Sequence, residues 1–122
     1  MSDVKRFEDL IAWQKARVLT VNVYELTRSG ALAADFGLRD QLRRACISVM
    51  SNIAEGFERC SVPDYLRFLT MAKASCAEVR RQSYIAFDVG DITQAQHAHL
   101  LSLTDELARI LAGLMAALER RK

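Results

Sequence analysis

A band of short polar side chains recurs at helical spacing near the middle of the chain. Its members lie three or four residues apart and are Gln41, Arg44, Ser48, Ser51, Asn52 and Glu55. A solvated helix face usually presents long charged residues, whereas hydroxyl and amide groups suit a contact between helices in which each polar atom finds a partner. We refer to this band as the polar stripe.

Three uses of the polar stripe follow from these residue types. We favour a hydrogen-bonded network inside a helical bundle or between subunits. The alternatives are a groove that contacts a peptide or a nucleic acid, and a catalytic cleft containing Asn52 and Glu55. Glu55 has apolar neighbours and needs a cationic or amide partner if it is buried. Because Arg43 and Arg44 lie more than two turns back, the sequence predicts that this partner comes from another helix or another chain.

Basic side chains provide a second candidate site. They are spread over the second and third predicted helices and are Arg39, Arg43, Arg59, Arg67, Lys73, Arg80 and Arg81. Because acidic residues such as Asp40, Asp64 and Glu78 are interleaved with them, the simplest interpretation is an ordinary solvated face. The functional alternative is a phosphate-binding strip for RNA or DNA, which symmetric repetition in an oligomer would amplify.

The remaining reactive residues do not form a recognisable catalytic or metal-binding pattern. His97 and His99 are two apart, so they point to different faces of a helix, and we interpret both as solvated residues. The chain contains no Glu-x-x-His pair and no glycine-rich phosphate loop. Cys46, Cys60 and Cys76 are an odd number of cysteines without CxxC spacing, which is typical of free thiols in a reducing cytoplasm. We therefore predict a non-enzymatic protein with no metal, no cofactor and no small-molecule substrate.

Four helices must position these side chains. Apolar periodicity predicts them at residues 7–28, 36–57, 61–89 and 93–120. Asp35 is expected to cap the second helix, and Ser61 to cap the third. Thr93 and Gln96 form the pattern of a capping box at the start of the fourth. Gly30 and Gly90 should stop the first and third helices.

Composition and length favour a single domain of long helices. The chain has 122 residues, of which 51% are hydrophobic and one is proline. Short connections between four long helices predict an all-α, antiparallel up-and-down four-helix bundle over residues 1–122. The formal net charge of +2 gives no support to strong nucleic-acid binding. No segment resembles a signal peptide or reaches the ~20 apolar residues of a membrane span, so we expect a cytoplasmic protein without membrane contact.

Seven segments of the chain match the sequence pattern of a known family. They are Phe7-Glu-Asp-Leu10, Trp13-Gln-Lys-Ala16, Gly37-Leu38, Gln41-Leu-Arg-Arg-Ala45, Ser48-Val-Met-Ser-Asn-Ile-Ala-Glu-Gly56, Tyr65-Leu-Arg-Phe-Leu69 and Ala72-Lys-Ala-Ser-Cys-Ala-Glu78. In these segments the chain resembles the four-helix-bundle family encoded by intervening sequences in bacterial large-subunit ribosomal RNA genes, whose members are often labelled ribosomal-protein-like. The chain has Met50 where the family usually has proline, and Ala74 where it usually has glycine.

The resemblance implies a cytosolic bundle that assembles as a five-fold ring. It also implies distant similarity to the accessory variability protein of diversity-generating retroelements, a basic pentameric bundle that binds nucleic acid and a reverse transcriptase. Apolar stripes on two sides of the first and third predicted helices independently favour a homo-oligomer. We therefore expect a non-enzymatic, pentameric assembly or binding protein. The alternative is an RNA- or DNA-binding accessory factor that uses the arginines of the second and third helices.

Overall fold

The computed structural model describes residues 4–121, and every regular element within them is helical. The all-α fold class predicted from the sequence is confirmed. In chain order the elements are a 3₁₀ turn η1 (Phe7–Asp9) and the helices α1 (Ile11–Leu26), α2 (Gly30–Ala34), α3 (Phe36–Phe57), α4 (Val62–Asp88) and α5 (Gln94–Glu119).

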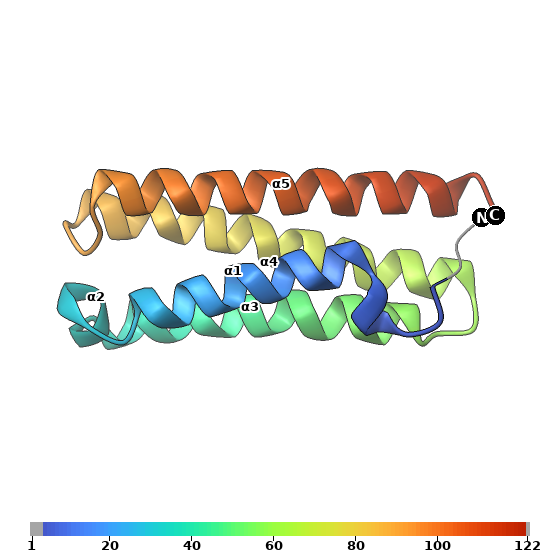
Figure 1. The fold of residues 1–122 in the computed structure, drawn as a ribbon, viewed down its shortest axis with the longest axis horizontal. Coiled ribbons are helices and arrows are strands. Elements are labelled where there is room, and N and C mark those ends of the chain that lie inside the picture. The colour runs from blue at the N-terminus through green and yellow to red at the C-terminus, as the bar shows by residue number, and fades with distance from the viewer. Residues whose placement is uncertain (1–3, 122) are drawn as a thin grey trace.

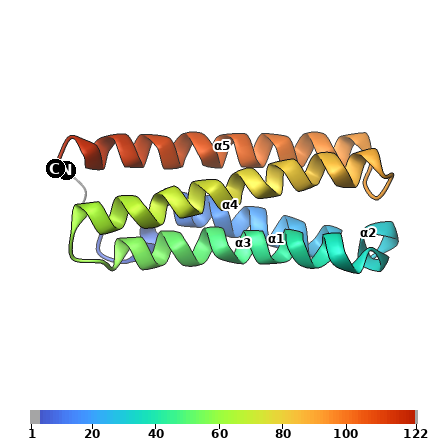
Figure 2. The same ribbon diagram turned by 180° about the vertical axis from the view of Figure 1, so that it is seen from behind.

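The four long helices form a bundle in which successive helices run in opposite directions (Figure 1). Helix α1 packs against α3 and α5, and α4 packs against the same two helices. Helices α1 and α4 therefore occupy diagonal corners of the bundle, as the front and back views show (Figure 1 and Figure 2). The short helix α2 lies at the end of the bundle opposite the α3–α4 connection.

Local signals place the helix ends where the sequence predicted them. The Asp35 side chain accepts a hydrogen bond from the backbone N–H of Leu38. The Ser61 hydroxyl accepts a hydrogen bond from the backbone N–H of Asp64 in the first turn of α4. Thr93 and Gln96 form a complete capping box at the start of α5. Each of these bonds satisfies a backbone donor that the first helical turn leaves free. Helices α4 and α5 each start one residue later and end one residue earlier than predicted, because the capping residues themselves are not helical.

The first predicted helix is interrupted, which corrects the range 7–28. Leu10 has an extended backbone with φ −71° and ψ 130°, so η1 and α1 are separate elements. The Leu10 side chain is only 8% exposed, and the break places it in the core. Helix α1 ends at Leu26, and Gly30, with φ +72°, begins α2. Gly30 thus has the left-handed conformation that the sequence predicted for it.

The core is built mainly from leucine, valine and alanine side chains on the inner faces of the long helices. At Gly56 the helices α3 and α4 approach each other closely. A Cβ at Gly56 would lie 2.9 Å from Cβ of Phe68 and 3.1 Å from Cδ1 of Tyr65. A side chain at this position would push the two helices apart, so glycine determines how tightly this hairpin packs.

Candidate functional site

The polar stripe lies on the side of α3 that borders α4. Ser48 and Asn52 are half-buried there, and the Oγ atoms of Ser48 and Ser75 lie 2.8 Å apart. The Asn52 amide donates to the backbone oxygen of Ser48 at 2.9 Å and to its Oγ at 3.0 Å. A network between α3 and α4 therefore includes two members of the polar stripe together with a serine from the facing helix.

The other four members of the polar stripe are exposed on a single chain. They are Gln41, Arg44, Ser51 and Glu55. Of the two residues of the predicted catalytic cleft, Asn52 is half-buried and bonded to Ser48, whereas Glu55 is exposed. The polar stripe therefore forms the outer edge of the α3–α4 contact, with its inner members bonded and its outer members facing solvent.

The prediction that the partner of Glu55 comes from another helix or another chain is wrong. Oε2 of Glu55 lies 3.0 Å from Nε of Arg59, four residues further along the same segment. Both side chains are about half exposed, so this is a surface ion pair of the i, i+4 type, which contributes at most ~1 kcal/mol. The i, i+4 spacing of Glu55 and Arg59 is visible in the sequence, but the prediction took into account only the arginines that precede Glu55.

Helix α4 has a matching stripe on the side that faces the polar stripe. Its members alternate at spacings of three and four residues and are Met71, Ser75, Glu78, Gln82, Ile85 and Val89. Ser75 is buried against Ser48, whereas Ile85 and Val89 are 51% and 61% exposed. Oε1 of Gln82 is buried without a hydrogen-bond partner in the structure. We call the exposed apolar part of this stripe, Met71, Ile85 and Val89, the α4 face.

A second exposed apolar surface lies on α1. It consists of Ile11, Val18 and Val21, which we call the α1 face. Ile11 is 61% exposed and Val21 is 50% exposed. Because α1 and α4 occupy diagonal corners, the α1 face and the α4 face lie on different sides of the bundle.

A shallow groove continues the apolar surface from α1 onto α3. It has a volume of about 320 Å³ and is lined by Phe7, Trp13, Ile47, Met50, Ser51 and Ala54. The rings of Phe7 and Trp13 meet edge to face, with centroids 5.1 Å apart. One polar-stripe residue, Ser51, thus lies at the border of an apolar groove.

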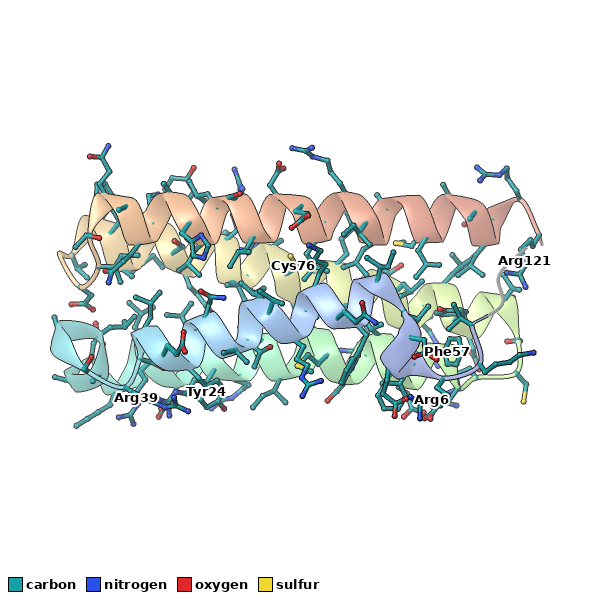
Figure 3. All side chains as sticks on the ribbon, viewed as in Figure 1. Arg6, Tyr24, Arg39, Phe57, Cys76 and Arg121 are labelled. Carbon is teal, nitrogen blue, oxygen red and sulfur yellow. The ribbon has the colours of Figure 1, made fainter. Side chains whose placement is uncertain are left out.

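The predicted basic strip is spread over both ends of the bundle and along α4. Arg39 and Arg43 lie at the end near α2, and Figure 3 shows Arg39 beside Tyr24 there. The guanidinium of Arg39 pairs with Asp40 at 2.9 Å. Arg43 donates to Oγ1 of Thr27 at 2.8 Å, and its guanidinium lies over the Tyr24 ring.

Two more of these arginines lie at the opposite end, in or near the α3–α4 connection. Arg59 and Arg67 lie over the ring of Phe68, with distances of 4.7 Å and 4.6 Å from guanidinium carbon to ring centroid. Each is also paired with a carboxylate, Arg59 with Glu55 and Arg67 with Asp64. Their charges are therefore partly neutralised.

The last three basic residues lie along α4. Lys73 and Arg81 are exposed, and Nη1 of Arg80 donates to the backbone oxygen of Leu101 on α5 at 3.4 Å. Lys73 and Arg80 line a hollow between α4 and α5 that also contains Asp105. On a single chain the seven basic side chains do not form one continuous strip.

The prediction that both histidines are solvated is wrong for His97. Its ring is buried, stacks on Phe87 with a 5.0 Å centroid separation, and lies with Nδ1 2.7 Å from Oγ of Ser83. His97 shares the inner face of α5 with Leu100 and Leu107, which is the spacing signal that the sequence interpretation missed. His99 is exposed and its Nε2 lies 3.2 Å from Oδ1 of Asn22.

A carboxyl pair joins the two loops at the α2 end of the bundle. A hydrogen bond between the Asp91 and Asp35 carboxyls raises the pKa of Asp91, and desolvation and the Asp35 charge act in the same direction. Oδ2 of Asp91 is buried without a donor. Such a hydrogen bond requires a proton on one of the two carboxyls, so this contact is sensitive to pH.

The three cysteines are free thiols in two different environments. Burial raises the pKa of Cys46 to about 12, although a hydrogen bond with Thr20 opposes the shift. Burial also raises the pKa of Cys76 to about 11. Cys60, in the α3–α4 connection, is exposed. Only Cys60 is therefore positioned to react with reagents in solution.

Two further properties concern residues 4–121 as a whole. Their His, Cys, Asp and Glu side chains include no group of three or more placed to hold a metal ion. None of their helices combines the length and the apolar character needed to cross a bilayer.

These features define a class of protein: a four-helix bundle with a bonded polar contact between α3 and α4 and with apolar surfaces left uncovered. A model of the family described as 23S rRNA-intervening sequence protein matches residues 8–113, and the chain belongs to this family. The family resemblance seen in the sequence is confirmed. A search of curated proteins finds no match.

A solved structure shares the fold. It is the crystal structure of a protein with unknown function from the S23 ribosomal protein family of Bacteroides thetaiotaomicron. The two chains superpose with a TM-score of 0.74 at 17% sequence identity, over 86% of this chain and 98% of the other. At this level of identity the similarity concerns the fold alone.

Proposed function

We propose that this chain is a non-enzymatic cytoplasmic protein that assembles into a closed homopentameric ring and acts as a binding scaffold. The observation that carries the proposal is the pair of exposed apolar surfaces, the α1 face and the α4 face. Single exposed apolar residues are common, but groups at helical spacing on a small domain usually mark an interface.

The positions of the two faces favour a ring over a simple two-fold dimer. A two-fold dimer buries the same surface on both copies, whereas a ring joins one surface of each copy to a different surface of the next. The α1 face and the α4 face lie on diagonal helices and are both apolar, so they fit the second arrangement. The proposed number of copies in the ring, five, is taken from the family resemblance.

Polar groups beside the α4 face support the same proposal. The exposed members of the polar stripe, Gln41, Arg44, Ser51 and Glu55, lie at the outer edge of the α3–α4 contact. Interfaces commonly surround an apolar centre with hydrogen-bonding groups of this kind. A neighbouring copy would cover these outer polar groups.

The first experiment measures the mass of the assembly by light scattering at micromolar chain concentration. We expect about five times the 13.7 kDa chain mass. Val18→Glu on the α1 face and Ile85→Glu on the α4 face should each disrupt the ring, because either substitution places a charge in one half of every contact. Ser102→Glu is the matched control, since Ser102 is exposed on α5, and it should leave the assembly intact.

Mixing the two disrupted variants separates a ring from a two-fold dimer. Val18→Glu keeps an intact α4 face and Ile85→Glu keeps an intact α1 face, so a ring contact predicts one-to-one heterodimers in the mixture. A two-fold interface predicts instead that one of the variants remains a dimer by itself. A wild-type monomer at this concentration would refute the assembly proposal.

The arginines give less support to nucleic-acid binding as the primary role. Three of the seven predicted residues, Arg39, Arg59 and Arg67, are paired with carboxylates, and the set is spread over both ends of the bundle and along α4. A gel shift with structured RNA tests this alternative, since phosphate-driven affinity should fall steeply as salt is raised.

A further inference from the structure

A hollow of about 270 Å³ opens at the end of the bundle that holds the α3–α4 connection. The connection itself, the first turns of α4 and the last turns of α5 form its walls. This volume is near the lower limit of small-molecule sites in proteins. The hollow lies at the end of the helices, whereas the α1 face and the α4 face lie along their sides.

Part of the lining of the hollow is apolar, and we call this part its floor. It includes Leu10, Phe57, Val62, Leu114 and Leu118. Leu10 and Leu118 are 8% and 2% exposed, so the floor of the hollow is continuous with the core. Phe57 meets the ring of Tyr65 edge to face, which makes one wall aromatic. An apolar group placed here would extend the core of the bundle.

The polar groups around the hollow include donors. The charged ones are the guanidinium groups of Arg59 and Arg121, which only donate, and the hydroxyl of Tyr65 is a further donor. Ser61 and Cys60 also line the hollow, and no acidic side chain is among the lining residues. Burial raises the pKa of Tyr65 to about 12 against the opposing charge of Arg121, so the hydroxyl keeps its proton at neutral pH. Figure 3 shows Arg121 and Phe57 at this same end of the bundle.

The two arginines differ in how strongly they are already engaged. Arg59 pairs with the half-exposed carboxylate of Glu55, a contact that solvent screens. Arg121 forms no ion pair within the described part of the chain. Arg121 is therefore the cation best placed to receive an anionic group from a ligand.

We propose that this hollow binds a small amphipathic carboxylate, with its apolar body on the leucine and phenylalanine floor and its carboxylate at Arg121 and Tyr65. An apolar floor beside two guanidinium groups favours an anionic head group over a cationic or a neutral one. The proposal adds a ligand to a chain for which the sequence predicted no small-molecule substrate, and it does not depend on the assembly proposal.

Three eight-carbon probes that differ only in the head group test the proposal: octanoate, octanol and octylammonium. Cys60 lines the hollow and is exposed, so the rate of its alkylation by neutral iodoacetamide reports whether the hollow is occupied. Mass spectrometry of the intact chain follows the reaction. We expect octanoate to slow alkylation with an affinity at least tenfold higher than that of octanol, and octylammonium to give no protection.

Two adjacent arginines supply a matched pair of variants. Arg121→Ala should weaken octanoate binding about tenfold, whereas Arg120→Ala should leave it unchanged, because Arg120 is exposed on the same turn but does not line the hollow. Both positions are exposed, so neither variant threatens folding. Equal protection by octanol and octanoate, or equal effects of the two substitutions, would overturn the proposal, as would a failure of octanoate to protect Cys60.

Discussion

The hydroxyl oxygens of Ser48 on α3 and Ser75 on α4 lie 2.8 Å apart, and Asn52 donates to the same Ser48 oxygen. Ser75 is almost fully buried. If Ser48 is removed, water therefore cannot freely take its place as the hydrogen-bond partner of Ser75. The pair thus joins the polar stripe to the facing helix through one satisfied bond at the edge of the core.

Replacing either serine by alanine should lower the free energy of unfolding. Ser48→Ala leaves the Ser75 hydroxyl without its partner, at a cost of about 1–3 kcal/mol. The double variant should cost less than the sum of the two single variants, because the second substitution removes an orphaned group. Urea denaturation at one fixed chain concentration measures the coupling. Ser51→Ala, at an exposed position of the polar stripe, should change stability by no more than about 0.5 kcal/mol.

Two glycines within helices predict opposite effects of the same substitution. Gly56→Ala should destabilise the bundle by about 1–3 kcal/mol, because the new Cβ would lie 2.9 Å from Cβ of Phe68. Gly113→Ala should stabilise it by about 0.5–1 kcal/mol, since nothing lies within 4 Å of a Cβ there and alanine is the better helix former. Urea unfolding curves compare the two variants. A stabilised Gly56→Ala variant would contradict the close packing of α3 and α4.

The carboxyl pair at the α2 end predicts a pH dependence of stability. The pKa of Asp91 is raised in the folded state, so the folded chain disfavours its ionised form and loses stability as pH rises through that pKa. Asp91→Asn removes this loss. We expect a higher melting temperature for Asp91→Asn than for the wild type at pH 7. The difference should shrink near pH ~3, where the carboxyl is protonated whether the chain is folded or unfolded.

A second substitution shows whether Asp35 is the cause of this effect. Asp35→Asn should also stabilise the chain at neutral pH, because asparagine caps α3 nearly as well as aspartate. The double variant should gain less than the sum of the two, since either substitution alone relieves the pair. If the stabilising effects of the two substitutions simply add, Asp35 is not the cause of the raised pKa of Asp91.

The thiols should react in two kinetic classes. Because burial raises the pKa of Cys46 to about 12 and that of Cys76 to about 11, both are almost entirely protonated at pH 8 and shielded from reagents. Iodoacetamide should add one group per folded chain, at Cys60, and two more only after denaturation. Peptide mapping locates the sites. Rapid modification of Cys46 in the folded chain would contradict its position in the core.

The helices were predictable because their signals are local. Asp35, Ser61 and Thr93 stand at the start of α3, α4 and α5 with the side chains that cap a first turn, and the structure uses all three. The interruption at Leu10 was not predictable by this route. No glycine or proline marks it, and only the burial of the leucine side chain in the finished bundle explains it.

The candidate site was only partly predictable, for a different reason. Helical spacing identifies which residues share a side of α3 and predicted a polar contact for them inside the bundle or between subunits, but it did not identify α4 as the helix that Ser48 and Asn52 border. It does not specify how deeply each residue is covered, because coverage depends on the facing helix. The same limit explains His97, whose spacing matched the core leucines although its residue type suggested solvent.

The connections between successive long helices have a kinetic consequence. Only a few residues separate Phe57 from Val62 and Asp88 from Gln94, so neighbouring helices meet without closing long loops. Chains with such local contacts fold in microseconds to milliseconds. If copies then join through the α1 face and the α4 face, the slow step in forming the complete particle is the encounter of finished chains. Its rate should rise with protein concentration, whereas the folding of each bundle should not.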